Sequence, residues 1–146
     1  MNEVSLARTR ERRAELLSLA AATELEQVAD DLLGRLGAPT VTSPPETGLV
    51  MLQVREPVCR DRFHVGEVVV SRAEVMWLGS AGWSMRLGCD RGAAVAAALC
   101  DAAAELDGGS EAVADLCDRV EARLADEAHA EWAALAPTRV TFEELD

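Results

Sequence analysis

Two stretches, LVMLQV at Leu49–Val54 and HVGEVVVSRAEVMWL at His64–Leu78, decide the fold of this chain. The first is a short, nearly continuous apolar run, which is typical of a strand covered on both faces. The second is rich in valine and predicts either one long strand or two strands with a bulge near Ser71–Arg72. After the turn GSAG, apolar and polar residues alternate from Trp83 to Leu87. That alternation predicts the partner strand of a hairpin.

Helical patterns precede these strands. Ser5–Ala22 predicts a first helix, and Thr23 with Glu26 forms a capping-box pattern that starts a second one. Gly34–Gly37 ends this second helix. The following segment, Ala38–Gly48, contains three prolines, which fit neither a helix interior nor a central strand. We therefore expect a loop there.

Helical periodicity returns after GCDRG, where Asp90 is a suitable N-cap for an alanine-rich helix. Ser110 starts a long helix that Pro137 ends, with an apolar stripe that includes Val113, Cys117, Val120, Leu124 and Leu135. The order predicts an α+β domain with N-terminal helices, a three- to four-stranded antiparallel sheet and two C-terminal helices. Its expected parts are a helical pair at 5–36, the sheet at 49–88, a helical pair at 90–136 and a tail at 137–146, in one domain of 1–146.

Charge and composition exclude several functions. The net charge of -12 argues against nucleic-acid binding, which needs a basic surface. No apolar run reaches the roughly 20 residues that span a bilayer, and no signal peptide is visible, so we expect a cytoplasmic protein without membrane contact. Arginines 8, 10, 12 and 13 predict either a solvated basic helix or a docking face for an acidic partner.

No known catalytic arrangement is visible in the sequence. There is no nucleophile elbow, no phosphate-binding glycine loop with lysine and no HExxH motif. His64 and His129 lack an orienting partner nearby, and Glu67, Glu74 and Asp90 each have a structural interpretation. A zinc site of Cys59, His64 and Cys89 lacks the paired ligand spacing of structural zinc sites. We therefore predict no catalytic residues and no metal ligands.

Three blocks carry a family resemblance. ETGLVMLQVR is followed by RFHVGEVVVSRAEV and then by LGCDR before an alanine-rich helix, and this series resembles the PhnG family of the carbon–phosphorus lyase system. The residues that match the family motifs are Glu46, Thr47, Gly48, Arg62, Phe63, Gly66, Glu67, Ser71, Arg72, Gly88, Asp90 and Arg91. Cys89 departs from the pattern, since it replaces an arginine of the third motif.

The resemblance implies an accessory subunit of the carbon–phosphorus lyase core complex, working with its H, I and J subunits and above all with the I-type subunit. That complex couples a phosphonate to MgATP with release of adenine and gives alpha-D-ribose 1-methylphosphonate 5-triphosphate. MgATP would be a substrate of the complex, and no cofactor would be bound by this subunit. The helices and the tail would provide much of the interface, and the isolated chain would self-associate or be poorly soluble.

The motif residues leave two roles open. Arg62, Arg72 and Arg91 suit phosphate groups geometrically, but each could equally pair with local carboxylates or with a partner chain. Glu46 and Thr47 are interpreted as hydrogen-bonding groups that either fix the approach to the strand or face a partner, rather than as catalysts. Two alternatives remain at this point: a chaperone like those of type III secretion, which are small acidic α+β binding proteins, and an independent enzyme that uses His64 and Glu67.

Overall fold

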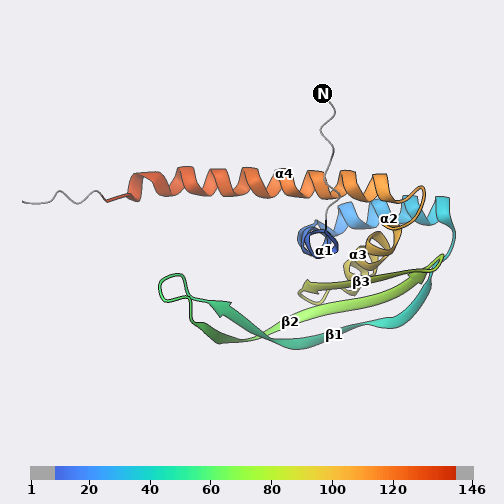
Figure 1. Cartoon of the computed structure of the whole chain (residues 1–146), viewed down its shortest axis with the longest axis horizontal. Coiled ribbons are helices and arrows are strands. Elements are labelled where there is room, and N and C mark those ends of the chain that lie inside the picture. The colour runs from blue at the N-terminus through green and yellow to red at the C-terminus, as the bar shows by residue number, and fades with distance from the viewer. Residues whose placement is uncertain (1–8, 141–146) are drawn as a thin grey trace, which may run out of the picture.

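The computed structural model describes residues 9–140 and confirms the predicted α+β class (Figure 1). In chain order the elements are α1 (Arg10–Leu19), α2 (Ala22–Leu36), β1 (Thr40–Arg55), β2 (Arg62–Trp77), β3 (Ser80–Leu87), α3 (Arg91–Ala103), α4 (Ser110–Leu135) and a short 3-10 helix, η1 (Ala136–Thr138). The described strands form one sheet in the order β1-β2-β3, with both neighbouring pairs antiparallel. The sheet therefore has the smaller of the two predicted strand numbers.

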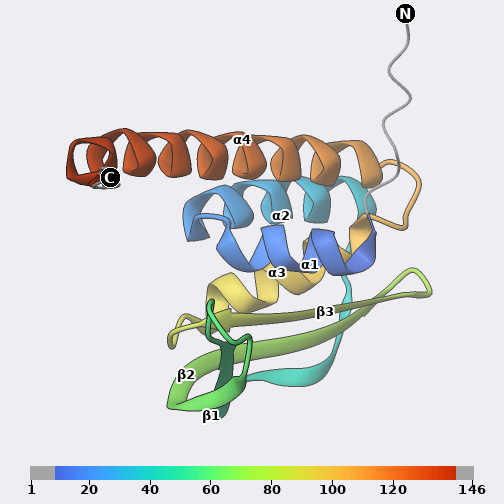
Figure 2. The ribbon, with the colours of Figure 1, turned by 60° about the vertical axis from the view of Figure 1, so that its left-hand side comes forward.

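The helices stack on one face of the sheet, as Figures 1 and 2 show. α3 lies directly on β2 and β3, and α1, α2 and α4 cover it from the other side. Trp77 from β2 is fully buried, together with Leu16, Leu25 and Leu32 from the first two helices. Ten of the thirteen residues of α3 are buried and most are alanine, so this helix can pack closely against its neighbours on all sides.

Two predicted boundaries among the first helices are wrong. α1 is capped by Thr9, whose hydroxyl accepts the Arg12 amide at 3.2 Å, and it ends at Leu19 rather than at residue 22. The predicted start at residue 5 lies outside the described residues. The cap of α2 is Ala21, two residues before the predicted one, because residues 20 and 21 are extended and form the whole link between the helices. Glu24, not Glu26, then accepts the Ala21 amide, at 3.4 Å.

β1 is much longer than predicted, since most of the expected proline loop belongs to the strand. The pairing with β2 skips residues at two irregularities, one between Val41 and Ser43 and one between Ser43 and Glu46. Pro44 and Pro45 fall in the second irregularity. Because β1 is an edge strand, these prolines remove no hydrogen bond from a central ladder, and this explains why the expectation of a loop is wrong.

β2 is one continuous strand, which confirms the first of the two predicted alternatives. Ser71 and Arg72 are regularly paired, whereas the register shifts opposite Leu52, where Val65 is the extra residue. The turn after β2 is also tighter than GSAG. Leu78 and Gly79 both have positive φ values, 47° and 85°, as in the two-residue turns that join twisted hairpin strands.

Beyond β3 the first two strands continue as a two-stranded arm, formed by Leu49–Arg55, Arg62–Val69 and the loop between them (Figure 1). β3 pairs only with Val70–Trp77, so it does not reach the arm. The prediction that the Leu49–Val54 strand is covered on both faces is wrong for this chain, since Leu49 is 61% and Met51 57% exposed.

α4 runs from Ser110 to Leu135 and stops before Pro137, as predicted. The first part of its apolar stripe is buried, namely Val113, Cys117 and Val120. All residues of Ala125–Leu135 are exposed, and this overhang extends past the rest of the helical layer (Figure 1). The predicted stripe therefore continues beyond the surface that it covers.

The four cysteines, all within the described residues, are free thiols. Cys59 and Cys89 are exposed, while Cys100 and Cys117 are core side chains, as predicted for Cys117. Burial raises the pKa of the Cys100 thiol to about 12, so it stays protonated and unreactive at neutral pH. No helix within residues 9–140 has the length and apolar character needed to cross a membrane.

Candidate functional site

The first and second motif blocks meet where β1 pairs with β2. Glu46 lies opposite Arg72 and Thr47 opposite Ser71 in the strand register. The Arg72 guanidinium donates from Nε to the Glu46 carboxylate at 2.7 Å, and its Nη1 lies 3.8 Å from Glu74. The hydroxyls of Thr47 and Ser71 are 3.1 Å apart. These cross-strand contacts fix the start of the arm.

The third motif block joins the same cluster from the N-terminus of α3. Ser71, fully buried, donates its hydroxyl hydrogen to the Gly88 carbonyl at 2.9 Å. Arg91 donates from Nε to the Thr47 hydroxyl at 3.2 Å. Asp90 accepts the Ala93 amide at 2.9 Å and so caps α3, as predicted. The three blocks are therefore brought together by the sheet register and by the turn into this helix, and we call the residues that meet here the junction cluster.

The junction cluster borders a shallow depression of about 340 Å³, lined by Glu46, Thr47, Gly48, Leu49, Val50, Val70, Arg72 and Met85. Its only carboxylate, Glu46, is already paired with Arg72. His64 lies on the arm and His129 on the α4 overhang, and both are exposed. Among residues 9–140 no three His, Cys, Asp or Glu side chains come together as a metal site would require. The polar side chains that border this depression are thus hydrogen-bonded to one another across β1, β2 and the N-terminus of α3.

The remaining residues of the second block lie on the arm, away from this cluster. Arg62, Phe63, Gly66 and Glu67 are all exposed. Gly66 has a φ of 150°, which side chains other than glycine's rarely allow, and it follows the bulged Val65. The motif residues thus divide into one group that the chain satisfies internally and one that it leaves open to solvent.

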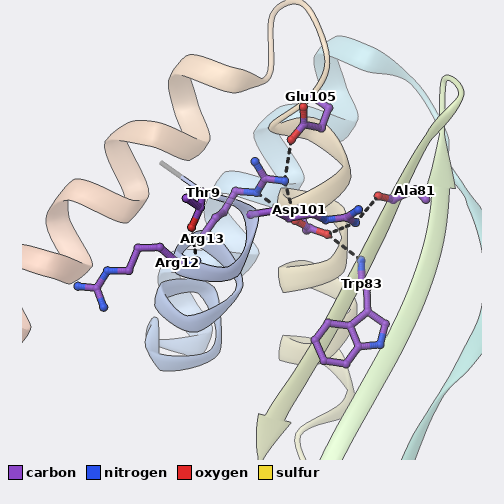
Figure 3. A network of polar contacts seen from close by, with 8 residues as sticks. Thr9, Arg12, Arg13, Ala81, Trp83, Asp101 and Glu105 are labelled. Carbon is purple, nitrogen blue, oxygen red and sulfur yellow. Dashed lines mark hydrogen bonds and ion pairs between the residues drawn. The ribbon is translucent and has the colours of Figure 1, made fainter. Parts of the chain in front are cut away.

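A buried polar network that no sequence motif predicts centres on Asp101 of α3 (Figure 3). This carboxylate is 1% exposed. It accepts hydrogen bonds from the guanidinium groups of Arg10, at 2.8 Å, and Arg13, at 3.0 Å, and from the Trp83 backbone amide at 3.0 Å. Arg13 also lies 2.8 Å from Glu105. The hydrogen bond from Arg10 to Asp101 raises the pKa of this arginine. The sequence signal is a single acidic residue inside an alanine-rich apolar helix.

This network gives the N-terminal arginines partners within the chain, while Arg10 and Arg12 also stay partly exposed to solvent, as a solvated helix predicts. Arg13 is buried on Asp101, and Arg12 pairs with Glu15 at 2.8 Å and with Glu121 of α4. The described arginines of the group therefore tie α1 to α3 and α4; Arg8 lies outside the described residues. A further arginine, Arg86, donates to the carbonyls of residues 17 and 20 at the end of α1, and burial lowers its pKa.

The loop at the end of the arm is held by Glu56. Its carboxylate accepts the amides of Val58, at 2.8 Å, and Cys59. Its own amide donates to the Asp61 carbonyl at 3.0 Å. The hydrogen bond from Val58 is the main cause that lowers the pKa of Glu56 below its ordinary value.

Acidification is therefore expected to loosen this loop before it affects the rest of the fold. A carboxyl group with a lowered pKa stabilises the folded state above its ordinary value of 4.5, and that contribution is lost as the pH falls through the lowered pKa. Amide hydrogen exchange at Val58 and Cys59 should accelerate below pH 4.5, beyond the intrinsic pH effect. In a Glu56→Gln variant the exchange should show no such transition; a transition that persists in this variant would contradict the assignment.

Known proteins similar to this chain identify what the three blocks belong to. A family model described as "Phosphonate metabolism protein PhnG" matches residues 8–145, a range that includes all three motif blocks. The alpha-D-ribose 1-methylphosphonate 5-triphosphate synthase subunit PhnG of Rhizobium meliloti (strain 1021) is 38% identical over 99 residues. The aligned region covers 67% of this chain and 64% of the length of that relative. Nothing in these matches supports the alternative of a secretion chaperone.

Proposed function

Because the chain belongs to the PhnG family of phosphonate metabolism proteins, we propose that it is an accessory subunit of an alpha-D-ribose 1-methylphosphonate 5-triphosphate synthase. The assembly would couple a phosphonate to MgATP and release adenine. The observation that carries the proposal is the similarity to a relative that is itself named as a synthase subunit. Cytoplasmic location is part of the proposal, and the exposed free thiols of Cys59 and Cys89 suit a reducing compartment.

The subunit would act by binding rather than by chemistry. Catalysis by a carboxylate or a nucleophile needs a group whose reactive atoms are free to meet a substrate. In the junction cluster Glu46 is paired with Arg72, the Ser71 hydroxyl is bonded to Gly88, and Asp90 caps a helix. The arm and the α4 overhang, in contrast, expose apolar side chains to solvent. Partner subunits commonly cover surface of this kind.

The partners proposed are the H, I and J subunits of the system, with the I-type subunit as the main one. Co-expression with this subunit should give a soluble stable complex, whereas the chain alone should self-associate. Adenine release from MgATP in the presence of methylphosphonate, followed by chromatography, should require both the chain and its partners. A solitary chain that stays monomeric and has no affinity for any of the three subunits would overturn the proposal.

Substitution of Arg72 can distinguish between two roles of this residue in the junction cluster, namely support of the structure and contact with a phosphate group of the substrate. Its guanidinium already has Glu46 as a partner, and this ion pair is only half-buried, so Arg72→Ala should cost at most about 1 kcal/mol of stability. The variant is therefore expected to assemble with its partners and to keep adenine release within about twofold of the wild type. Glu46→Gln, which breaks the same ion pair, is the matched control. Loss of activity in an assembled Arg72→Ala complex alone would show contact with substrate.

A further inference from the structure

The arm described above extends beyond β3, so its two strands pair only with each other. One of its faces is entirely apolar. Alternation along the paired strands places Val50, Leu52, Val54, Phe63 and Val68 on that face, and Leu52 is 39% and Phe63 49% exposed. The face continues into an apolar depression of about 450 Å³, which Leu19, Trp83 and Leu87 also line. Apolar surface of this extent on one side of a hairpin marks a binding face.

The opposite face of the arm changes from apolar near the body to basic at the end of the arm. Near the body it exposes Leu49 and Val69, the latter 44% exposed, and at the end of the arm it carries Arg55 and Arg62. A two-stranded hairpin with solvent on both faces is marginally stable in water. Its length beyond β3 therefore indicates that another molecule covers it from more than one side.

The charges at the end of the arm define the chemistry of that molecule. Arg55 and Arg62 are directly opposite each other in the register, an arrangement of like charges that is unfavourable without an intervening anion. Within residues 9–140, neither they nor Arg60 have an ion-pair partner. Glu56 is occupied by the amides of its own loop. Asp61 lies between Arg60 and Arg62 in sequence but forms an ion pair with neither of them within residues 9–140, so the arginines keep donors for carboxylates from outside the chain.

We propose that the arm inserts into an apolar cleft of a partner subunit and that carboxylates line the far end of this cleft. The inference rests on the proposed function, because it names the surface by which the accessory subunit joins its assembly. It also gives a role to the motif residues that lie on the arm, outside the junction cluster: Phe63 anchors the apolar face, Arg62 meets the carboxylates, and Gly66 sets the bend at the bulge. A second copy of this chain is the less suitable occupant, since each copy brings a net charge of -12.

The apolar face can be tested with one charged side chain. In the complex with co-expressed H, I and J subunits, Phe63→Asp should weaken binding at least tenfold, because it places a carboxylate in an apolar cleft. The matched control is Leu78→Asp, at a residue 68% exposed in the turn at the other end of the sheet. The control should bind as the wild type does, and both isolated variants should unfold at the wild-type denaturant midpoint. Equal affinity of Phe63→Asp and the wild type would overturn the proposal.

The carboxylates can be tested separately. The double variant Arg55→Glu, Arg62→Glu should weaken binding to the partner subunits at least tenfold at low salt. Arg35→Glu, a charge reversal at an arginine of α2, should leave this binding unchanged. Hydrogen exchange should show residues 49–55 and 62–69 protected in the wild-type complex. If the wild-type chain binds none of the subunits, the proposed function fails. If it binds them with the arm unprotected, or if the arm variants abolish only a homodimer in light scattering, this inference alone fails.

Discussion

Asp101→Asn is expected to lower the free energy of unfolding by about 3–5 kcal/mol. The carboxylate is 1% exposed and faces two guanidinium groups, of which Arg13 is itself buried. The amide that replaces it is of similar size but cannot neutralise Arg13. The loss of stability arises because the buried positive charge of Arg13 then lacks its buried partner. Glu105 still pairs with Arg13, but this carboxylate is exposed and compensates the charge only in part.

Urea unfolding followed by circular dichroism measures this effect. Asp107→Asn, at an exposed position in the α3–α4 loop, is the matched control and should change stability by less than about 0.5 kcal/mol. In a double-mutant cycle, removing Arg13 as well should recover much of the loss, since both charges are then gone. A loss of less than about 1 kcal/mol in Asp101→Asn would show that the network is not a main support of the fold.

Gly82→Ala should be almost as damaging, for a steric reason. A Cβ built on Gly82 would lie 2.0 Å from the Ala98 carbonyl oxygen and 2.8 Å from the Ala102 Cβ, both in α3. Neither neighbour is the end of a flexible side chain, so β3 and α3 must move apart. We expect a loss of about 3 kcal/mol, at the upper end of what overpacking usually costs.

Gly48→Ala is the appropriate comparison for this substitution. Gly48 also lies in a strand, but no atom comes within 4 Å of the added Cβ and its φ is not in the left-handed region. This control should change the unfolding free energy by no more than about 0.5 kcal/mol. If both glycine variants unfold at the same denaturant concentration, the close contact between β3 and α3 is not as tight as the structure indicates.

The order of elements was predictable because local signals and tertiary packing agree for most of the chain. Asp90 marks the start of α3 through its side-chain cap, and Pro137 marks the end of α4 because proline cannot continue a helix. α4 also begins at Ser110 as predicted, although its N-cap is Gly109. The prediction is wrong where the same local sequence pattern is compatible with two different tertiary arrangements. The apolar run Leu49–Val54 indicates burial, but it does not specify whether the same chain or another one does the covering. The prolines at 44 and 45 likewise exclude a central strand and permit an edge.

The candidate site was predictable only as a set of residues. The family resemblance identified the motif positions, yet spacing along the chain could not show that Thr47 meets Ser71 and Arg91 while Phe63 stays apart. That division follows from the strand register, which depends on all the side chains of both strands. The role of Asp101 was unpredictable for a related reason. Its arginine partners come from α1, 88 and 91 positions away in sequence, and no local pattern joins them.

The arm also affects how long an unassembled chain survives. Exposed loop tips of small or polar residues are the sites where proteases cut most readily. The loop after β1 is such a tip, with Val58 85% exposed, and it lies far from the helices that hold the body together. A molecule that finds no partner therefore offers an accessible cleavage point. If the arm inserts into a partner subunit as proposed, assembly would shield this loop, limit the pool of orphan copies and keep the subunits in balance.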